Sequence, residues 1–256
     1  MGAEQQDSGD ESIRRRTFGA AESVADFEAR LADVRALIGA AAARAGRDAS
    51  QVRLLPVSKT VPQERLRNAH AAGITHMAEN KVQEAQRKSR EMADLDLTWA
   101  IIGHLQTNKA KDVAEFATEF QALDSLKLAE ALERRLEGFD RSLDVLVQVN
   151  TSRESSKTGL APEDVEDFIK ALPQFSRLNV KGFMTMAPFS ADPARVRQSF
   201  VELRGLRDRA REYAPEGMDL SELSMGMSGD FELAIEEGAT VVRVGQAIFG
   251  SRSYPA

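Results

Sequence analysis

The sequence predicts a single (β/α)8 barrel of the TIM type with an extra N-terminal helix, and three observations carry this prediction. Short apolar segments alternate with amphipathic segments about eight times along the chain. The apolar segments are mostly continuous, as expected of parallel strands that helices cover. The length of 256 residues also suits a barrel, which typically needs about 250.

The extra helix comes first. Phe27, Leu31, Val34 and Ile38 lie on one helical face, and the pattern ends near Gly46. The expected strands after it are 52–58, 74–78, 97–102, 119–123, 143–149, 178–185, 220–224 and 240–244. The expected helices are 62–72, one starting at 80, 108–116, 125–136, 162–172, 193–213, 229–237 and 246–249. A doubly wound open sheet is the main alternative, but the Gly-rich turn that it usually carries after an early strand is missing.

Composition narrows the class of protein. The formal net charge of −6 argues against a nucleic-acid binder, and the absence of cysteine excludes disulfides and zinc–thiolate sites. No apolar stretch approaches the ~20 residues that span a bilayer. We expect residues 1–20 to be a disordered, non-secretory tail and residues 21–256 to form one domain, because the interior has no linker-like segment. We therefore expect a cytoplasmic monomer with no nucleic-acid, membrane or metal partner.

Lys59 is the first candidate functional residue. It ends an apolar segment that reads as a buried strand and precedes a turn and a helix. A lysine there points into the mouth of an α/β fold, where lost hydration makes its free-base form more accessible. A neutral amine can form a Schiff base with an aldehyde. The alternative is a lysine that only reaches solvent from the end of a strand.

The last two loops suggest a phosphate site. In barrels, phosphates often lie between the loops after strands seven and eight, on backbone N–H groups at a short helix N-terminus. Gly226 and Gly245 would let the backbone approach a ligand, and Ser228 offers a hydroxyl and a helix N-cap. These residues could equally be only caps and tight turns.

Other polar residues at the strand ends have two interpretations each. Arg243 lies two residues before Gly245, so its guanidinium could face the ring of a ligand or form a structural ion pair inside the barrel. Asn80 is a natural N-cap or a ring contact. His104 is expected to be structural. Met184 and Met227, with their neighbouring methionines, more often fill a barrel than bind a cofactor.

Taken together, the strand ends resemble one family, the pyridoxal 5′-phosphate homeostasis proteins (YggS/PROSC type), which are related to the N-terminal barrel of alanine racemase. Eight short segments match it in order, from about Val52 to Gly250. They are Leu55–Thr60, Glu79–Glu84, Ile102–Lys109, Ser156–Leu160, Gly182–Met184, Leu223–Ser228, Asp230–Ile235 and Val242–Gly250. The chain departs from the family in having Ala78 before the Glu-Asn pair, where glycine is common, and Lys81 after it, where an aromatic residue is frequent.

The resemblance implies a site for pyridoxal 5′-phosphate (PLP). Lys59 would hold PLP as an internal aldimine, Arg243 would face the pyridine nitrogen, and Asn80 would line the ring. Ser228 and Gly245 would bind the phosphate together with Gln246. The full expected set is Lys59, Asn80, Met184, Ser224, Met227, Ser228, Arg243, Gly245 and Gln246.

The same residues favour a carrier over an enzyme. An arginine at the ring nitrogen disfavours its protonation and damps carbanion chemistry. Racemisation also needs a second base, a tyrosine in alanine racemase, and the chain has only Tyr213 and Tyr254. We expect a non-catalytic PLP buffer, with PLP-dependent apo-enzymes as possible recipients. A racemase of limited scope and a cofactor-free Schiff-base aldolase are the alternatives.

Overall fold

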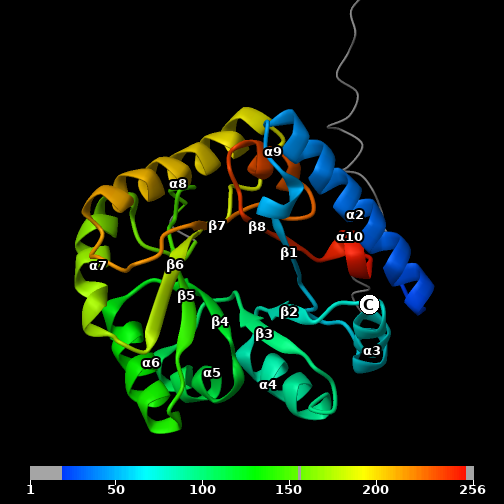
Figure 1. Ribbon diagram of the computed structural model, residues 1–256, viewed down its shortest axis with the longest axis horizontal. Coiled ribbons are helices and arrows are strands. Elements are labelled where there is room, and N and C mark those ends of the chain that lie inside the picture. The colour runs from blue at the N-terminus through cyan, green and yellow to red at the C-terminus, as the bar shows by residue number, and fades with distance from the viewer. Residues whose placement is uncertain (1–18, 155–156, 252–256) are drawn as a thin grey trace, which may run out of the picture.

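The computed structural model describes residues 19–154 and 157–251, which form a (β/α)8 barrel of parallel strands surrounded by helices (Figure 1). The predicted fold class is confirmed. The strands are β1 (Arg53–Pro56), β2 (His76–Glu79), β3 (Thr98–Ile101), β4 (Glu119–Leu123), β5 (Leu143–Gln148), β6 (Leu178–Met184), β7 (Glu222–Ser224) and β8 (Val241–Val244). The α-helices are α2 (Val24–Arg44), α3 (Gln63–Ala71), α4 (Val82–Glu91), α5 (Ala110–Phe116), α6 (Leu126–Phe139), α7 (Val165–Ala171), α8 (Pro193–Tyr213), α9 (Phe231–Glu236) and α10 (Gln246–Phe249).

The barrel closes unevenly around its circumference. Its strands follow the order β1-β8-β7-β6-β5-β4-β3-β2, and β1 pairs with β8 along its whole length. Between β1 and β2, by contrast, a single bridge joins Val57 to Ala78, and the N–H of Ser58 donates to the carbonyl of Ala78 at 2.9 Å. The seam of the barrel therefore lies directly beside Lys59.

The extra N-terminal helix α2 packs on the outside of the barrel next to α9 and α10 (Figure 1). Ser23 and Asp26 form a capping box at its start, which satisfies N–H groups that would otherwise be unpaired. Its buried face includes Phe27, Leu31, Val34 and Ile38, as the spacing predicts. The ring of Phe27 meets the edge of Phe249 at 5.7 Å, so α2 holds α10 against the barrel.

A charged cluster closes the N-terminal end of the barrel. The guanidinium of Arg53 donates to both oxygens of Glu119, at 2.9 and 3.0 Å, and to Glu222 at 3.1 Å. All three residues begin a strand. Burial would raise the pKa of Glu119, but the hydrogen bonds and charge of Arg53 outweigh it and hold that pKa below its usual value. This end of a barrel typically serves stability.

The sequence placed most elements within a few residues of their observed limits, and 119–123, 193–213 and 246–249 agree fully. Two predicted helix caps are wrong. Lys81 precedes α4 where Asn80 was expected, and Asp230 precedes α9 where Ser228 was expected; neither side chain caps its helix.

Most of the predicted tail, at 1–18, lies outside the described residues, as do Ser156 and Tyr254. None of the described helices combines the length and the apolar character that crossing a membrane requires.

Candidate functional site

The predicted site residues lie at or beyond the carboxyl ends of β1, β2, β6, β7 and β8. Met184 and Ser224 end β6 and β7 and are fully buried. Asn80, directly after β2, is exposed. Lys59 is half-buried in a turn three residues beyond the end of β1, so it lies further from the strand than its sequence predicted.

The turn that carries Lys59 is fixed on both sides. Before it, the hydroxyl of Ser58 donates to Glu79 Oε1 at 2.7 Å. After it, Thr60 adopts a φ of 65°, which non-glycine residues rarely do, and its N–H donates to Glu84 Oε1 at 2.8 Å. Two carboxylates from the Glu79–Glu84 segment therefore hold the residues on either side of the candidate lysine.

Lys88 of α4 ties these carboxylates together beneath the turn. Lys88 is fully buried, and its Nζ donates to Glu79 Oε1 at 2.7 Å, to Glu84 Oε1 at 2.8 Å and to the carbonyl of Ser58 at 2.9 Å. Burial raises the pKa of Glu79, and the charge of Lys88 offsets only part of that effect. Glu79 Oε2 is buried without a hydrogen-bond partner. The Lys88 cluster, defined as Ser58, Glu79, Glu84 and Lys88, is thus a buried ionic support for Lys59.

Arg243 lies in the centre of the barrel and is only 4% exposed. Its Nη1 donates to Ser224 Oγ at 2.8 Å and its Nη2 to the carbonyl of Thr185 at 2.8 Å. Burial lowers the pKa of Arg243 to about 10, so it stays charged at neutral pH. A structural ion pair, the alternative interpretation of Arg243, does not form within 19–154 and 157–251.

The predicted phosphate loops are held against each other. The N–H of Gly245 donates to Ser228 Oγ at 3.3 Å, which brings the loops after β7 and β8 together. Gln246, the first residue of α10, is exposed, and Met227 is 40% exposed rather than packed in the barrel. Gly226 has a φ of +93°, and a Cβ there would lie 2.6 Å from that of Ala234, so helix α9 approaches this glycine closely.

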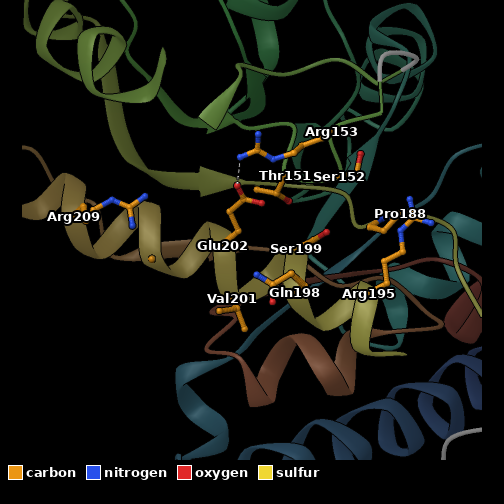
Figure 2. A pocket seen from close by; sticks show the side chains of 11 residues that line it. Thr151, Ser152, Arg153, Pro188, Arg195, Gln198, Ser199, Val201, Glu202 and Arg209 are labelled. Atoms are coloured by element: carbon orange, nitrogen blue, oxygen red, sulfur yellow. Dashed lines mark hydrogen bonds and ion pairs between the residues drawn. The ribbon is translucent and has the colours of Figure 1, made fainter. Parts of the chain in front are cut away.

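A separate hollow of about 700 Å³ lies beside this site, between the loop after β5 and helix α8 (Figure 2). It contains none of the predicted site residues. It is lined by Thr151, Ser152, Arg153, Pro188, Arg195, Gln198, Ser199, Val201, Glu202, Gly205 and Arg209. Thr151 links it to the barrel centre through a 2.9 Å hydrogen bond to the hydroxyl of Thr185, whose carbonyl binds Arg243. The chemistry at the strand ends therefore lies outside this hollow.

His104 was predicted to be structural, and its surroundings are those of a rim residue. Its ring is half exposed, and Nδ1 lies 3.6 Å from Asp124 Oδ2. Burial raises the pKa of Asp124, and the nearby His104 only partly offsets this. The pair follows β3 and β4 at the mouth of the barrel.

Two buried residues that contact the site were missed at the sequence level, Lys88 and Gln121. Lys88 sits in a strongly polar helix, and only its spacing of four from Glu84 hinted at a contact. Gln121 was the stronger signal, because it is a polar residue in an apolar strand and shares a face with Glu119. Lys88 is a hydrogen-bond partner of the buried Glu79, and Gln121 is one of the buried Ser224. Buried polar side chains need such partners.

Comparisons with known proteins identify the family of the chain. The family model for the alanine racemase N-terminal domain matches residues 31–253. The pyridoxal phosphate homeostasis protein of Pseudomonas aeruginosa is 43% identical over 88% of this chain and 96% of its own length. Its counterpart in Aquifex aeolicus is 42% identical over 88% and 98%. The chain belongs to the pyridoxal phosphate homeostasis protein family.

Solved structures extend the comparison within and beyond this family. PipY of Synechococcus elongatus, solved with PLP bound, is 36% identical, with a TM-score of 0.77 over 88% of this chain and all of the PipY chain. The structure without PLP has a TM-score of 0.80. Alanine racemase of Clostridium difficile has a TM-score of 0.73 at 14% identity, over 94% of this chain and 60% of its own, and so shares the fold alone.

Proposed function

We propose that this protein binds pyridoxal 5′-phosphate through a Schiff base on Lys59 and acts as an intracellular buffer of the cofactor. Family membership supports the proposal, because relatives are named for PLP homeostasis and PipY has been solved with PLP bound. The observation that carries it is that the strand ends hold both a half-buried lysine in a fixed turn and a buried arginine that forms no salt bridge within the described residues. PLP supplies an aldehyde for the lysine and a ring nitrogen and phosphate for the rest of the site.

The residues at the strand ends fit such a ligand. Arg243 has N–H groups beyond the two that bind Ser224 and Thr185, and the pyridine nitrogen is an acceptor that one of them can serve. Ser228, Gly245 and Gln246 follow the last two strands, where barrels typically hold phosphate. We assign the lining of the ring and its surroundings to Asn80, Met184, Ser224 and Met227.

Two features favour a carrier over a racemase. Arg243 places a positive charge where a carboxylate would be needed to keep the ring nitrogen protonated. Tyr213 ends α8, whose carboxyl end leads back toward the start of β7, and Lys170 lies 5.5 Å from its ring centre. That tyrosine is therefore at the opposite end of the barrel from Lys59. Among the described residues, the His104–Asp124 pair at the mouth is the candidate second base of a racemase.

The test begins with the protein incubated with PLP, reduced with borohydride and mapped by mass spectrometry. We expect visible-range absorbance before reduction and the label on Lys59 afterwards. Lys59→Ala should abolish both, whereas Lys81→Ala, which removes an exposed lysine from the neighbouring loop, should leave both intact. A label on any other lysine, or no absorbance with saturating PLP, contradicts the proposal.

We further propose that the loaded protein works as a cytoplasmic monomer and passes PLP to PLP-dependent apo-enzymes. Loaded protein should reactivate an apo-transaminase faster than PLP dissociates into solution. Reactivation that only matches the dissociation rate would show release without direct transfer. Exchange of the Cα hydrogen of alanine or serine with solvent deuterium, lost in His104→Gln, would instead favour the racemase.

A further inference from the structure

We infer that Glu119 and Gln121 are positioning residues that act on Arg243 through Ser224, as a remote countercharge for its guanidinium. The inference rests on the proposed function for the role of Arg243 toward PLP. It concerns a chain of hydrogen bonds across the barrel, here called the relay and made of Glu119, Gln121, Ser224 and Arg243.

The relay is continuous and buried. Gln121 Nε2 donates to Glu119 Oε1 at 2.5 Å, Ser224 Oγ donates to Gln121 Oε1 at 2.7 Å, and Arg243 Nη1 donates to Ser224 Oγ at 2.8 Å. These bonds cross the barrel from β4 to β7 and then to β8. Gln121 and Ser224 are 0% exposed. Each side chain in the relay is therefore shielded from water that could replace its partner.

The direction of every bond is fixed by chemistry. Glu119 is held ionised by Arg53, so its oxygen only accepts and the amide of Gln121 must donate to it. The Gln121 oxygen then faces Ser224 and accepts its hydroxyl proton. Arg243 only donates, so it takes a lone pair of the Ser224 oxygen. The dipoles of Gln121 and Ser224 both point their negative ends toward Arg243.

Aligned dipoles of this kind stabilise a positive charge although no carboxylate is in direct contact with it. Hydrogen bonds in a low-dielectric interior polarise one another, so the relay carries part of the effect of the Glu119 charge to Arg243. A carboxylate in direct contact would instead form a bidentate pair and occupy the donors that face it. The relay thus keeps Arg243 charged and in place while leaving its remaining N–H groups for a ligand. Asp230, at the start of α9, is the other acidic group that acts on Arg243, through space.

The deciding variant is Gln121→Met, which keeps the size of the side chain and breaks the relay in the middle. The matched control is Gln148→Met: Gln148 is also a buried strand glutamine, but it binds Thr158 outside the relay. Gln121→His retains one donor and one acceptor and tests rescue. Thermal unfolding of each apo-protein reports the purely structural cost.

The first readout needs no cofactor. In apo-protein, the ¹³Cζ resonance of Arg243, assigned by its loss in Arg243→Gln, is followed against pH. In Gln121→Met we expect its midpoint to fall below that of the wild type, while Gln148→Met leaves it unchanged and Gln121→His restores part of the shift. An unchanged midpoint in Gln121→Met overturns the inference.

The second readout is the dissociation constant for PLP. Losing the support of one hydrogen bond to a charged group is expected to raise it about 3- to 10-fold in Gln121→Met. Equal affinities of wild type and Gln121→Met also overturn the inference. If wild-type protein does not take PLP on Lys59, the proposed function fails, yet the apo-protein titration still decides whether the relay acts on Arg243.

Discussion

Lys88 and Arg243 are both cations buried beside the same end of the barrel, and they are handled in opposite ways. Lys88 binds two carboxylates directly, at 2.7 and 2.8 Å, and its three hydrogen bonds satisfy its ammonium group. Arg243 donates to a hydroxyl and a carbonyl. The relay connects it to the carboxylate of Glu119 through the side chains of Ser224 and Gln121.

This difference indicates that Lys88 has a structural role, whereas Arg243 has donors available for a ligand. A buried cation that is fully paired within the protein has no donor left for a ligand, so Lys88 can only position the turn that carries Lys59. For a buried cation with unused donors, a ligand that accepts hydrogen bonds offsets part of the desolvation cost, which is why we propose Arg243 as a binding group. Changes to Lys88 should therefore affect stability first, and changes to Arg243 should affect PLP affinity first.

The largest expected effect is that of Lys88→Met on stability. Removing one partner of a buried pair leaves Glu79 as an uncompensated charge, which typically costs about 3–5 kcal/mol. Urea unfolding of the apo-protein measures this. Arg87→Met, on the same helix, removes an exposed pair with Glu91 and should cost less than about 1 kcal/mol. Equal losses in the two variants would mean that the Lys88 cluster is not a structural support.

Glu119→Gln should change how stability depends on pH. The pKa of Glu119 is lowered in the folded protein, so its contribution is present above its unfolded pKa, about 4.5, and is lost as the pH falls through the folded value. The variant should be less stable than wild type by roughly 3 kcal/mol at pH 7. The difference in the free energy of unfolding between wild type and variant should become smaller as the pH falls below about 4.5. Urea unfolding midpoints at several pH values measure it. A gap that stays constant down to pH 3 contradicts the assignment.

Arg243→Gln should reverse the pattern of Lys88→Met. It removes charged donors from the ligand, so we expect the dissociation constant for PLP to rise about tenfold or more. Because the hydrogen-bond partners of the Arg243 side chain are a hydroxyl and a carbonyl and not a carboxylate, the loss of stability should be smaller than in Lys88→Met. Equilibrium dialysis and urea unfolding on the same samples measure both quantities. A stability loss as large as that of Lys88→Met with unchanged PLP affinity would remove the distinction between the two cations.

The smallest expected effect is on the rate of covalent capture. Glu84→Gln weakens the bond that holds the N–H of Thr60, next to Lys59, while Glu79 still holds Ser58. We expect the visible absorbance to form about 2- to 5-fold more slowly in stopped-flow mixing with PLP, since one hydrogen bond contributes about 0.5–1.5 kcal/mol. A rate equal to that of wild type would mean that the Lys59 turn is held by Glu79 and Lys88 alone.

Much of the fold followed from hydrophobic periodicity, because a buried strand or an amphipathic helix leaves a signal in its own residues. The long helix α8 and the strand β4 were predicted with their observed limits. The helix starts near Asn80 and Ser228 were not, because local preference for a cap competes with the loop geometry that joins strand and helix.

The candidate site was predictable one strand end at a time, but not as a network. Lys59, Ser224 and Arg243 each follow or lie in an apolar segment and could be singled out in turn. The partners of Arg243 could not, because the contact between Gln121 and Ser224 joins residues 103 positions apart. The burial of Lys88 was also hidden, since a lysine in a polar helix normally lies in solvent.

The central claim is that one ligand joins Lys59 to Arg243, and a crystal structure of the protein with PLP tests it most directly. The account predicts continuous density from Lys59 Nζ into the ligand, with the ring nitrogen within hydrogen-bonding distance of Arg243. PLP attached to another lysine, or bound to Lys59 with its ring turned away from Arg243, would contradict it.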